Sequence, residues 1–115
     1  MPNFPKLELT GFARKDGRWG FRNQILVLPL HSALCSIARN TADSFSNPSV
    51  VSVTHDWAGE IDKDWNRICK VFSGFAANPN NFAVLFLTLG NANGDEIISK
   101  ANRIGIENYQ VLNLQ

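Results

Sequence analysis

Four short apolar runs alternate with three segments of helical period, and this alternation constrains the fold more than any other feature of the sequence. The apolar runs are Gln24 to Leu30, Ser49 to Thr54, Phe82 to Leu89 and Tyr109 to Leu114. Strands separated by helices run parallel, because each crossover returns the chain to the same edge of the sheet. The pattern therefore predicts an α/β fold, a three-layer sandwich built around a four-stranded parallel sheet.

Three helices are expected between these strands, each with one apolar stripe at spacings of three and four residues. Ser32 is placed to cap the first helix, Asn78-Pro79-Asn80 to end the second and Gly105 to end the third. The stripes are Leu34, Ile37, Ala38, Thr41, Ala42 and Phe45, then Ile61, Trp65, Ile68, Phe72 and Phe75, then Ile97, Ile98, Ala101 and Ile104. Each stripe is expected to face the sheet.

The character of the strands predicts their order. The first and third runs are continuously apolar, as in strands covered on both faces, whereas the second and fourth are shorter and more mixed. This favours the order 2-1-3-4 of a flavodoxin- or Rossmann-like sheet. Ligands of such sheets bind beyond the carboxyl ends of the strands, where the winding reverses. The loops expected there are Leu30-His31-Ser32, His55-Asp56-Trp57 and Gly90-Asn91-Ala92-Asn93.

Length and charge limit the kind of protein. A chain of 115 residues with 44% hydrophobic residues fits one domain, in which a basic arm and loop over residues 1–23 precede an α/β domain over residues 24–115. The formal net charge of +1 gives no long-range field for nucleic acid or an acidic membrane. The stretch Met1 to Leu9 has no apolar core of signal-peptide length, and the longest apolar run, Phe82 to Leu89, is too short to cross a bilayer. We expect a cytoplasmic protein with no nucleic-acid or membrane partner, and expect Cys35 and Cys69 to be buried free thiols.

A basic segment precedes the first strand. Its cations and glycines are Arg14, Lys15, Gly17, Arg18, Gly20 and Arg22. A guanidinium can grip a carboxylate or phosphate through two parallel hydrogen bonds, and glycine lets the backbone approach an anion closely. The segment therefore predicts an anion site, with a solvated turn whose arginines pair with local acids as the alternative. It is neither a P-loop nor a dinucleotide fingerprint, because neither glycine pattern lies between a strand and its helix.

Two histidines follow strands at the expected ligand edge. His55 closes the second strand, where an imidazole serves as a general base, as a metal ligand or as a hydrogen-bonded structural residue. His31 follows the first strand, and His31, His55 and Asp56 together would make an open metal site. The backbone N–H groups of Gly90 to Gly94 can receive an anion at a helix start, although Gly and Asn also simply turn a chain.

Several stretches, taken in order, resemble one known family. Gly11-Phe12-Ala13-Arg14 followed by Asp16 to Asn23 is similar to a GYxRxDGRxGxRN opening. The first strand and helix, then Val53-Thr54-His55, then Gly74 to Asn80 leading to Leu89-Gly90 follow in the family's order. Over nearly the whole chain, these stretches resemble the altronate dehydratase/galactarate dehydratase family, which also includes sulfolactate sulfo-lyase.

The resemblance implies the first part of the main catalytic region of a hydro-lyase that dehydrates a sugar acid. Members use a divalent metal, usually Fe²⁺, so the resemblance implies this cofactor and a small sugar acid as substrate. Dehydration next to a carboxylate needs a grip on the carboxylate, a base for the α-proton and help for the departing hydroxide. We expect His55 as the base or a metal ligand and His31 as a second ligand. The residues expected to bind substrate are Arg14, Arg18, Arg22, Asn23, Ser32 and Asn91.

The resemblance also implies that the chain acts with other parts. The rest of the catalytic chain or a partner subunit would supply the remaining machinery, so no activity is expected from this chain alone. The exposed fourth strand is expected to pair with a further strand or with another subunit, as in a homo-oligomer, since open sheet edges are usually covered.

Three departures from the family leave a second function open. Ala33, Gly59 and Asn91 stand where the family typically has cysteine. A diverged, non-catalytic homologue that binds an anion or serves in assembly is therefore the alternative. A nucleotide-binding response module of flavodoxin-like fold is a third reading, but the sequence has no glycine fingerprint or acidic triad to support it.

Overall fold

The structure is a computed structural model that describes residues 10–60 and 63–115. Its centre is a four-stranded sheet of order β4-β3-β5-β6, in which every neighbouring pair is parallel. In chain order these are the four predicted runs, with bounds β3 Gln24–Pro29, β4 Val50–Ser52, β5 Asn81–Thr88 and β6 Tyr109–Asn113. The predicted α/β class and four-stranded parallel sheet are therefore confirmed.

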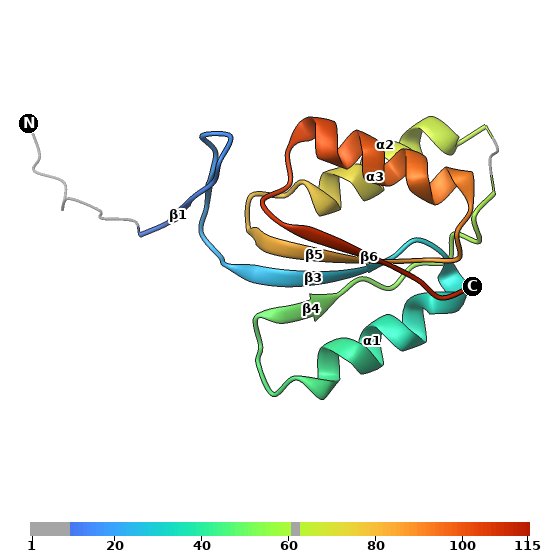
Figure 1. The fold of residues 1–115 in the computed structure, drawn as a ribbon, viewed down its shortest axis with the longest axis horizontal. Helices are drawn as coiled ribbons and strands as arrows, with labels where there is room; N and C mark the ends of the chain where they lie inside the picture. The colour runs from blue at the N-terminus through green and yellow to red at the C-terminus, as the bar shows by residue number, and fades with distance from the viewer. Residues whose placement is uncertain (1–9, 61–62) are drawn as a thin grey trace, which may run out of the picture.

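Helices cover both faces of the sheet (Figure 1). The bounds are α1 Cys35–Ser44, α2 Trp65–Ala76 and α3 Ala92–Ile104, with a 3₁₀ turn, η1, at Ser32–Leu34. Helices α2 and α3 pack on the face that carries Leu28 and Phe86, and α1 packs on the face that carries Val27 and Leu87. The central strands β3 and β5 are buried because they have helices on both sides.

The helix ends differ from expectation at two places. Ser32 is not the cap of the first helix, because the chain makes η1 first and the His31 imidazole accepts the N–H of Ala33. Helix α3 starts inside the predicted loop, where the Asn91 side chain accepts the N–H of Gly94. The same helix ends at Gly105 as predicted, with φ of 131°. Ile61, the expected first residue of the α2 stripe, lies outside the described residues.

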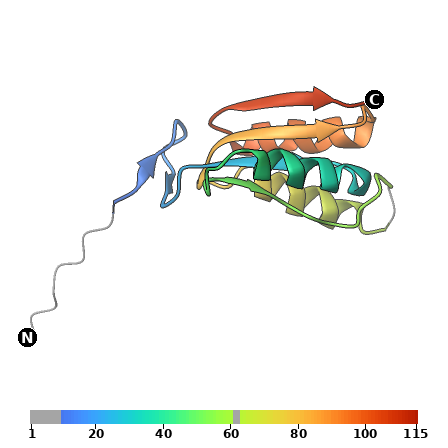
Figure 2. The same ribbon diagram turned by 90° about the horizontal axis from the view of Figure 1, so that it is seen from below.

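The basic segment forms a small hairpin that the sequence pattern did not predict. Strand β1 (Phe12–Ala13) pairs antiparallel with β2 (Trp19–Gly20), and Gly17 turns the chain between them with φ of 89°. Figure 2 shows the hairpin beyond the amino ends of the parallel strands. The segment is thus an ordered attachment to one end of the sheet.

Two further expectations concern burial. Cys35 in α1 and Cys69 in α2 are buried free thiols, as predicted. Burial raises the pKa of the Cys69 thiol above its ordinary value. Among residues 10–60 and 63–115, no helix combines the length and hydropathy that a membrane span requires.

Candidate functional site

The structure separates the predicted site residues into two groups at opposite ends of the sheet (Figure 1). The amino edge carries Arg14, Arg18, Arg22 and Asn23, and the carboxyl edge carries His31, Ser32, His55 and Asn91. Strand β3 joins the two edges with six residues, which at about 3.3 Å per residue span roughly 20 Å. One small acid therefore cannot contact both groups within a single copy of the chain.

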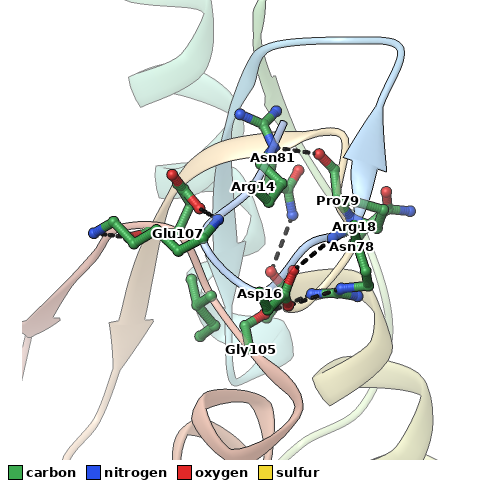
Figure 3. A pocket seen from close by; sticks show the side chains of 11 residues that line it. Arg14, Asp16, Arg18, Asn78, Pro79, Asn81, Gly105 and Glu107 are labelled. Carbon is green, nitrogen blue, oxygen red and sulfur yellow. Dashed lines mark hydrogen bonds and ion pairs between the residues drawn. The ribbon is translucent and has the colours of Figure 1, made fainter. Parts of the chain in front are cut away.

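At the amino edge, Arg14 fastens the hairpin to the sheet (Figure 3). Its side chain is only 9% exposed, and Nε donates to the carbonyl oxygen of Pro79 over 2.6 Å. Nη1 donates to Oδ1 of Asn23 over 3.0 Å, and Nη2 donates to the carbonyl oxygen of Arg22 over 2.9 Å. The guanidinium of Arg14 and the side chain of Asn23 are thus engaged with each other and with the backbone.

Arg18 is held by a carboxylate and by the end of α3. Its Nε donates to Oδ2 of Asp16 over 2.8 Å, and Nη2 donates to the carbonyl oxygen of Gly105 over 3.0 Å. The backbone N–H of Arg18, and then its guanidinium, lower the pKa of the Asp16 carboxyl below its ordinary value of 3.8. For Arg18, the structure agrees with the alternative of an arginine paired with a local acid.

The cavity between these groups is small. Arg14, Asp16 and Arg18 line it together with Glu107, and its volume is about 40 Å³ (Figure 3). That volume holds only a few water molecules. Arg22 is different, because its exposed guanidinium has no hydrogen-bond partner in the part of the chain that the structure describes. Arg22 is therefore the arginine of the predicted set that is left free for an external anion.

At the carboxyl edge, three loops from separate parts of the chain meet. The N–H of Ser32 donates to the carbonyl oxygen of Trp57 over 2.6 Å, which joins the loops after β3 and β4. Gly59 lies against the other two loops: a Cβ at this position would be 3.0 Å from Nδ2 of Asn91 and 3.3 Å from Cδ2 of His31. The predicted convergence of these loops is therefore found.

Gly59 and Asn93 also lie at this edge, and neither was among the predicted site residues. The sequence drew attention to Gly59 only as a departure from the resembling family. Gly59 has φ of 84°, a conformation that L side chains rarely adopt, and its carbonyl oxygen accepts from Nδ2 of Asn93 over 2.6 Å. The sequence feature that could have identified Gly59 is a glycine directly after the loop at the end of a strand. Asn93 carries no such signal, because its role depends on a partner 34 positions away.

Two side chains of this edge each keep a hydrogen-bond donor that the described residues do not use. Nδ1 of His31 accepts the N–H of Ala33 over 3.0 Å, so in the neutral ring the proton lies on Nε2. Oδ1 of Asn91 accepts the N–H of Gly94 over 3.0 Å, which leaves the Nδ2 amide as a donor. Asn91 also caps α3, whose N-terminus carries partial positive charge. Such a set of donors suits a carboxylate.

His55 is bound to the backbone through both ring nitrogens. The N–H of Trp57 donates to Nδ1 over 3.1 Å, so the proton lies on Nε2, which donates to the carbonyl oxygen of Pro29 over 2.7 Å. The ring also packs edge-on against Phe72, with the ring centroids 4.6 Å apart. Action as a base or ligand stays a prediction, and it requires one of these hydrogen bonds to break.

The described residues do not form a metal centre by themselves. No three His, Cys, Asp or Glu side chains in residues 10–60 and 63–115 gather so that they could hold a metal ion. The triad of His31, His55 and Asp56 is therefore not formed, because both His55 nitrogens bind the backbone. The loops that meet carry Ala33, Gly59 and Asn91 where the resembling family has cysteine.

A larger groove lies beside α2, next to the carboxyl edge. It has a volume of about 530 Å³, and Trp57, Phe72 and Phe75 line it along with His55 and Arg67. Its size is within the range of ligand pockets, and its lining combines the aromatic side chains with polar and charged ones, including Asp56 and Glu60.

Comparison with known proteins identifies the family but no individual relative. No curated protein and no solved structure shows a significant match to the chain. The family model described as D-galactarate dehydratase/altronate hydrolase, second domain, matches residues 11–115. This match covers the hairpin and all of the sheet, and the chain therefore belongs to the D-galactarate dehydratase/altronate hydrolase family.

Proposed function

We propose that this chain is part of a hydro-lyase that dehydrates a sugar acid, and that its carboxyl edge binds the carboxylate of that acid. The observation that carries the proposal is the meeting of His31, Gly59 and Asn91 at the end of the sheet where ligands of such folds bind. The family match supports a role in this kind of dehydratase.

The proposed role of each group follows from its free hydrogen-bonding capacity. Nε2–H of His31 and Nδ2 of Asn91 donate to the carboxylate oxygens, and the N-terminus of α3 adds a favourable field. Gly59 has no side chain, and this lets its backbone lie close to both residues, where a Cβ would crowd Nδ2 of Asn91 and the ring of His31. The edge binds and orients the acid.

The remaining chemistry requires groups from elsewhere. A divalent metal such as Fe²⁺ would assist the departure of hydroxide. Since the described residues do not form a ligand set, a metal-assisted elimination needs ligands from the rest of the catalytic chain or from a partner subunit. The chain alone is expected to bind the acid without converting it.

A non-catalytic module that binds an anion or serves in assembly is the second candidate. The double backbone engagement of His55 favours it, because no other histidine follows β4 to replace that ring as a base. Elimination of water from a polyhydroxy acid yields an enol that becomes a keto acid. An assay of keto-acid formation from galactarate separates the two candidates, when this protein is combined with the rest of a dehydratase chain. Product formation supports the hydro-lyase, and its absence supports the non-catalytic module.

Binding is tested by NMR and calorimetric titration of the protein with galactarate. We expect amide shifts in residues 31–33, 57–60 and 90–94. His31→Ala should weaken binding by about tenfold, which is the loss of roughly one good hydrogen bond. Arg39→Ala, which removes an exposed cation from α1 away from both edges, is the matched control and should leave the affinity unchanged.

The opposite pattern contradicts the proposal. If amide shifts concentrate in residues 12–23 and Arg22→Ala abolishes binding, the acid binds at the amino edge. Absence of any binding by the folded protein would also reject a complete carboxylate site on this chain.

A further inference from the structure

Within residues 10–60 and 63–115, strand β6 is an edge of the sheet, and it lacks the charges, proline and bulge that commonly protect such edges. All five of its residues are exposed, including Tyr109 at 38%, Val111 at 43% and Leu112 at 47%. The strand has no charge and no proline, and its pairing with β5 contains no bulge. An edge of this kind offers a template for another strand.

The hydrogen bonds to β5 fix which backbone groups of β6 point outward. The N–H of Val84 donates to the carbonyl oxygen of Asn108, and the N–H of Leu114 donates to the carbonyl oxygen of Thr88. Backbone groups alternate in direction along a strand, so the even-numbered residues of β6 bind β5. The N–H and C=O groups of its odd-numbered residues therefore point away from the sheet, namely those of Tyr109, Val111 and Asn113.

From this arrangement we propose that β6 pairs antiparallel with β6 of a second copy, about a twofold axis at Val111. In this register, Val111 of each copy exchanges two hydrogen bonds with Val111 of the other. Tyr109 of each copy likewise pairs with Asn113 of the other, so every outward N–H and C=O of the strand has a partner. The result is one continuous sheet through both copies.

The side chains fit the same register. Tyr109, Val111 and Asn113 lie on one face of the sheet and Gln110 and Leu112 on the other, because side chains alternate along a strand. The twofold axis places the two β-branched Val111 side chains directly opposite each other, a favourable cross-strand pair. The five residues of β6 are uncharged, so the paired strands themselves place no like charges opposite each other.

The other open edge of the sheet is less suited to pairing. Strand β4 has only three residues, Val50–Ser52, and the chain leaves strand geometry after Ser52. A short edge strand is a common protection against pairing. The self-pairing surface is therefore assigned to β6, and it does not depend on the proposed dehydratase function.

The test measures self-association by sedimentation velocity over a concentration series. It relies on the twofold axis, which places residue 111 of one copy opposite residue 111 of the other. The unmodified protein should sediment as a dimer. Val111→Lys places two ammonium groups opposite each other, so it should raise the dimer dissociation constant by about tenfold or more. Val111→Glu should do the same. An equimolar mixture of the two variants should recover the dimer, because the opposite charges then face each other.

The matched control is Ile37→Lys, which replaces an apolar residue of similar exposure, 45%, on α1. It should leave the dimer intact. A monomeric unmodified protein overturns the proposal, as does a dimer that Val111→Lys does not weaken. Failure of the mixture to recover the dimer overturns the proposed register at Val111. Galactarate binding at the other end of the strands is measured separately, so failure of one proposal does not imply failure of the other.

Discussion

Arginine side chains of one short segment have different roles in this protein. Arg14 is buried and makes three hydrogen bonds, Arg18 is paired with Asp16, and Arg22 is exposed. All three share the same chemistry and lie within the same motif. Their roles differ because burial and partners differ, so a residue's chemical type indicates its capacity but not its use.

Arg14→Met should reduce the free energy of unfolding by about 1–3 kcal/mol, because it leaves the carbonyl oxygens of Pro79 and Arg22 without their donors. Urea unfolding followed by tryptophan fluorescence measures the change. The control, Arg22→Met, should change stability by no more than about 0.5 kcal/mol, because its guanidinium is exposed. Equal effects of the two substitutions would show that Arg14 does not fasten the hairpin.

Asp16 should make the hairpin sensitive to acid. Its pKa is lowered in the folded protein, so its contribution to stability is fully present above the ordinary value of 3.8 and is lost as the pH falls through the lower folded value. Between about pH 5 and about pH 2, the unmodified protein should lose more stability than Asp16→Asn. Parallel pH profiles of the two proteins in urea unfolding would contradict this expectation.

At the scale of elements, the hairpin and the sheet meet through close backbone contact. Gly20 lies directly against the carbonyl group of Pro79, and a Cβ at Gly20 would overlap that group. This contact explains why a glycine ends β2, and the same position in an isolated hairpin would tolerate a larger residue.

Gly20→Ala should therefore destabilise the protein by about 1–3 kcal/mol, since the backbone at Pro79 must move to admit the methyl group. Gly74→Ala is the matched control, and it is expected to change the stability in the opposite direction. Gly74 lies within α2 with no atom within 4 Å of its Cβ position, so alanine there should stabilise the helix by about 0.5–1 kcal/mol. Thermal unfolding of both variants measures the difference, and a shift in the same direction for both would count against the docking contact.

At the scale of the whole molecule, stability should be distributed unevenly. Strands β3 and β5 are buried between helices, whereas the hairpin is joined to the body by polar contacts and one close backbone contact. Sub-global opening is expected where few apolar side chains are buried.

Native-state hydrogen exchange should follow this distribution. Amides of residues 26–28 and 84–87 should exchange only through global unfolding, whereas amides of residues 12–20 should exchange through a smaller opening. In monomeric Val111→Lys, the outward amides of Tyr109 and Asn113 should exchange faster than those of Gln110 and Leu112. Uniform protection across the hairpin and the central strands would show that the molecule opens as one unit.

The sequence by itself determined the α/β class, the four strands and the burial of Cys35 and Cys69. These features follow from hydrophobic periodicity, which is a local property that a chain carries before it folds. The end of α3 at Gly105 was predictable from another local property, because a glycine can adopt the backbone conformation that ends a helix.

Only the tertiary structure decided which predicted site residues lie together. Arg14 is bound to Pro79, 65 positions away, and this contact places the basic segment at the amino edge. His55 binds the backbone of Pro29, 26 positions away, while Gly59 meets His31 and Asn91. Local patterns set which segments become strands and helices, but hydrogen-bond partners distant in sequence are fixed only when the sheet assembles and brings its edges together.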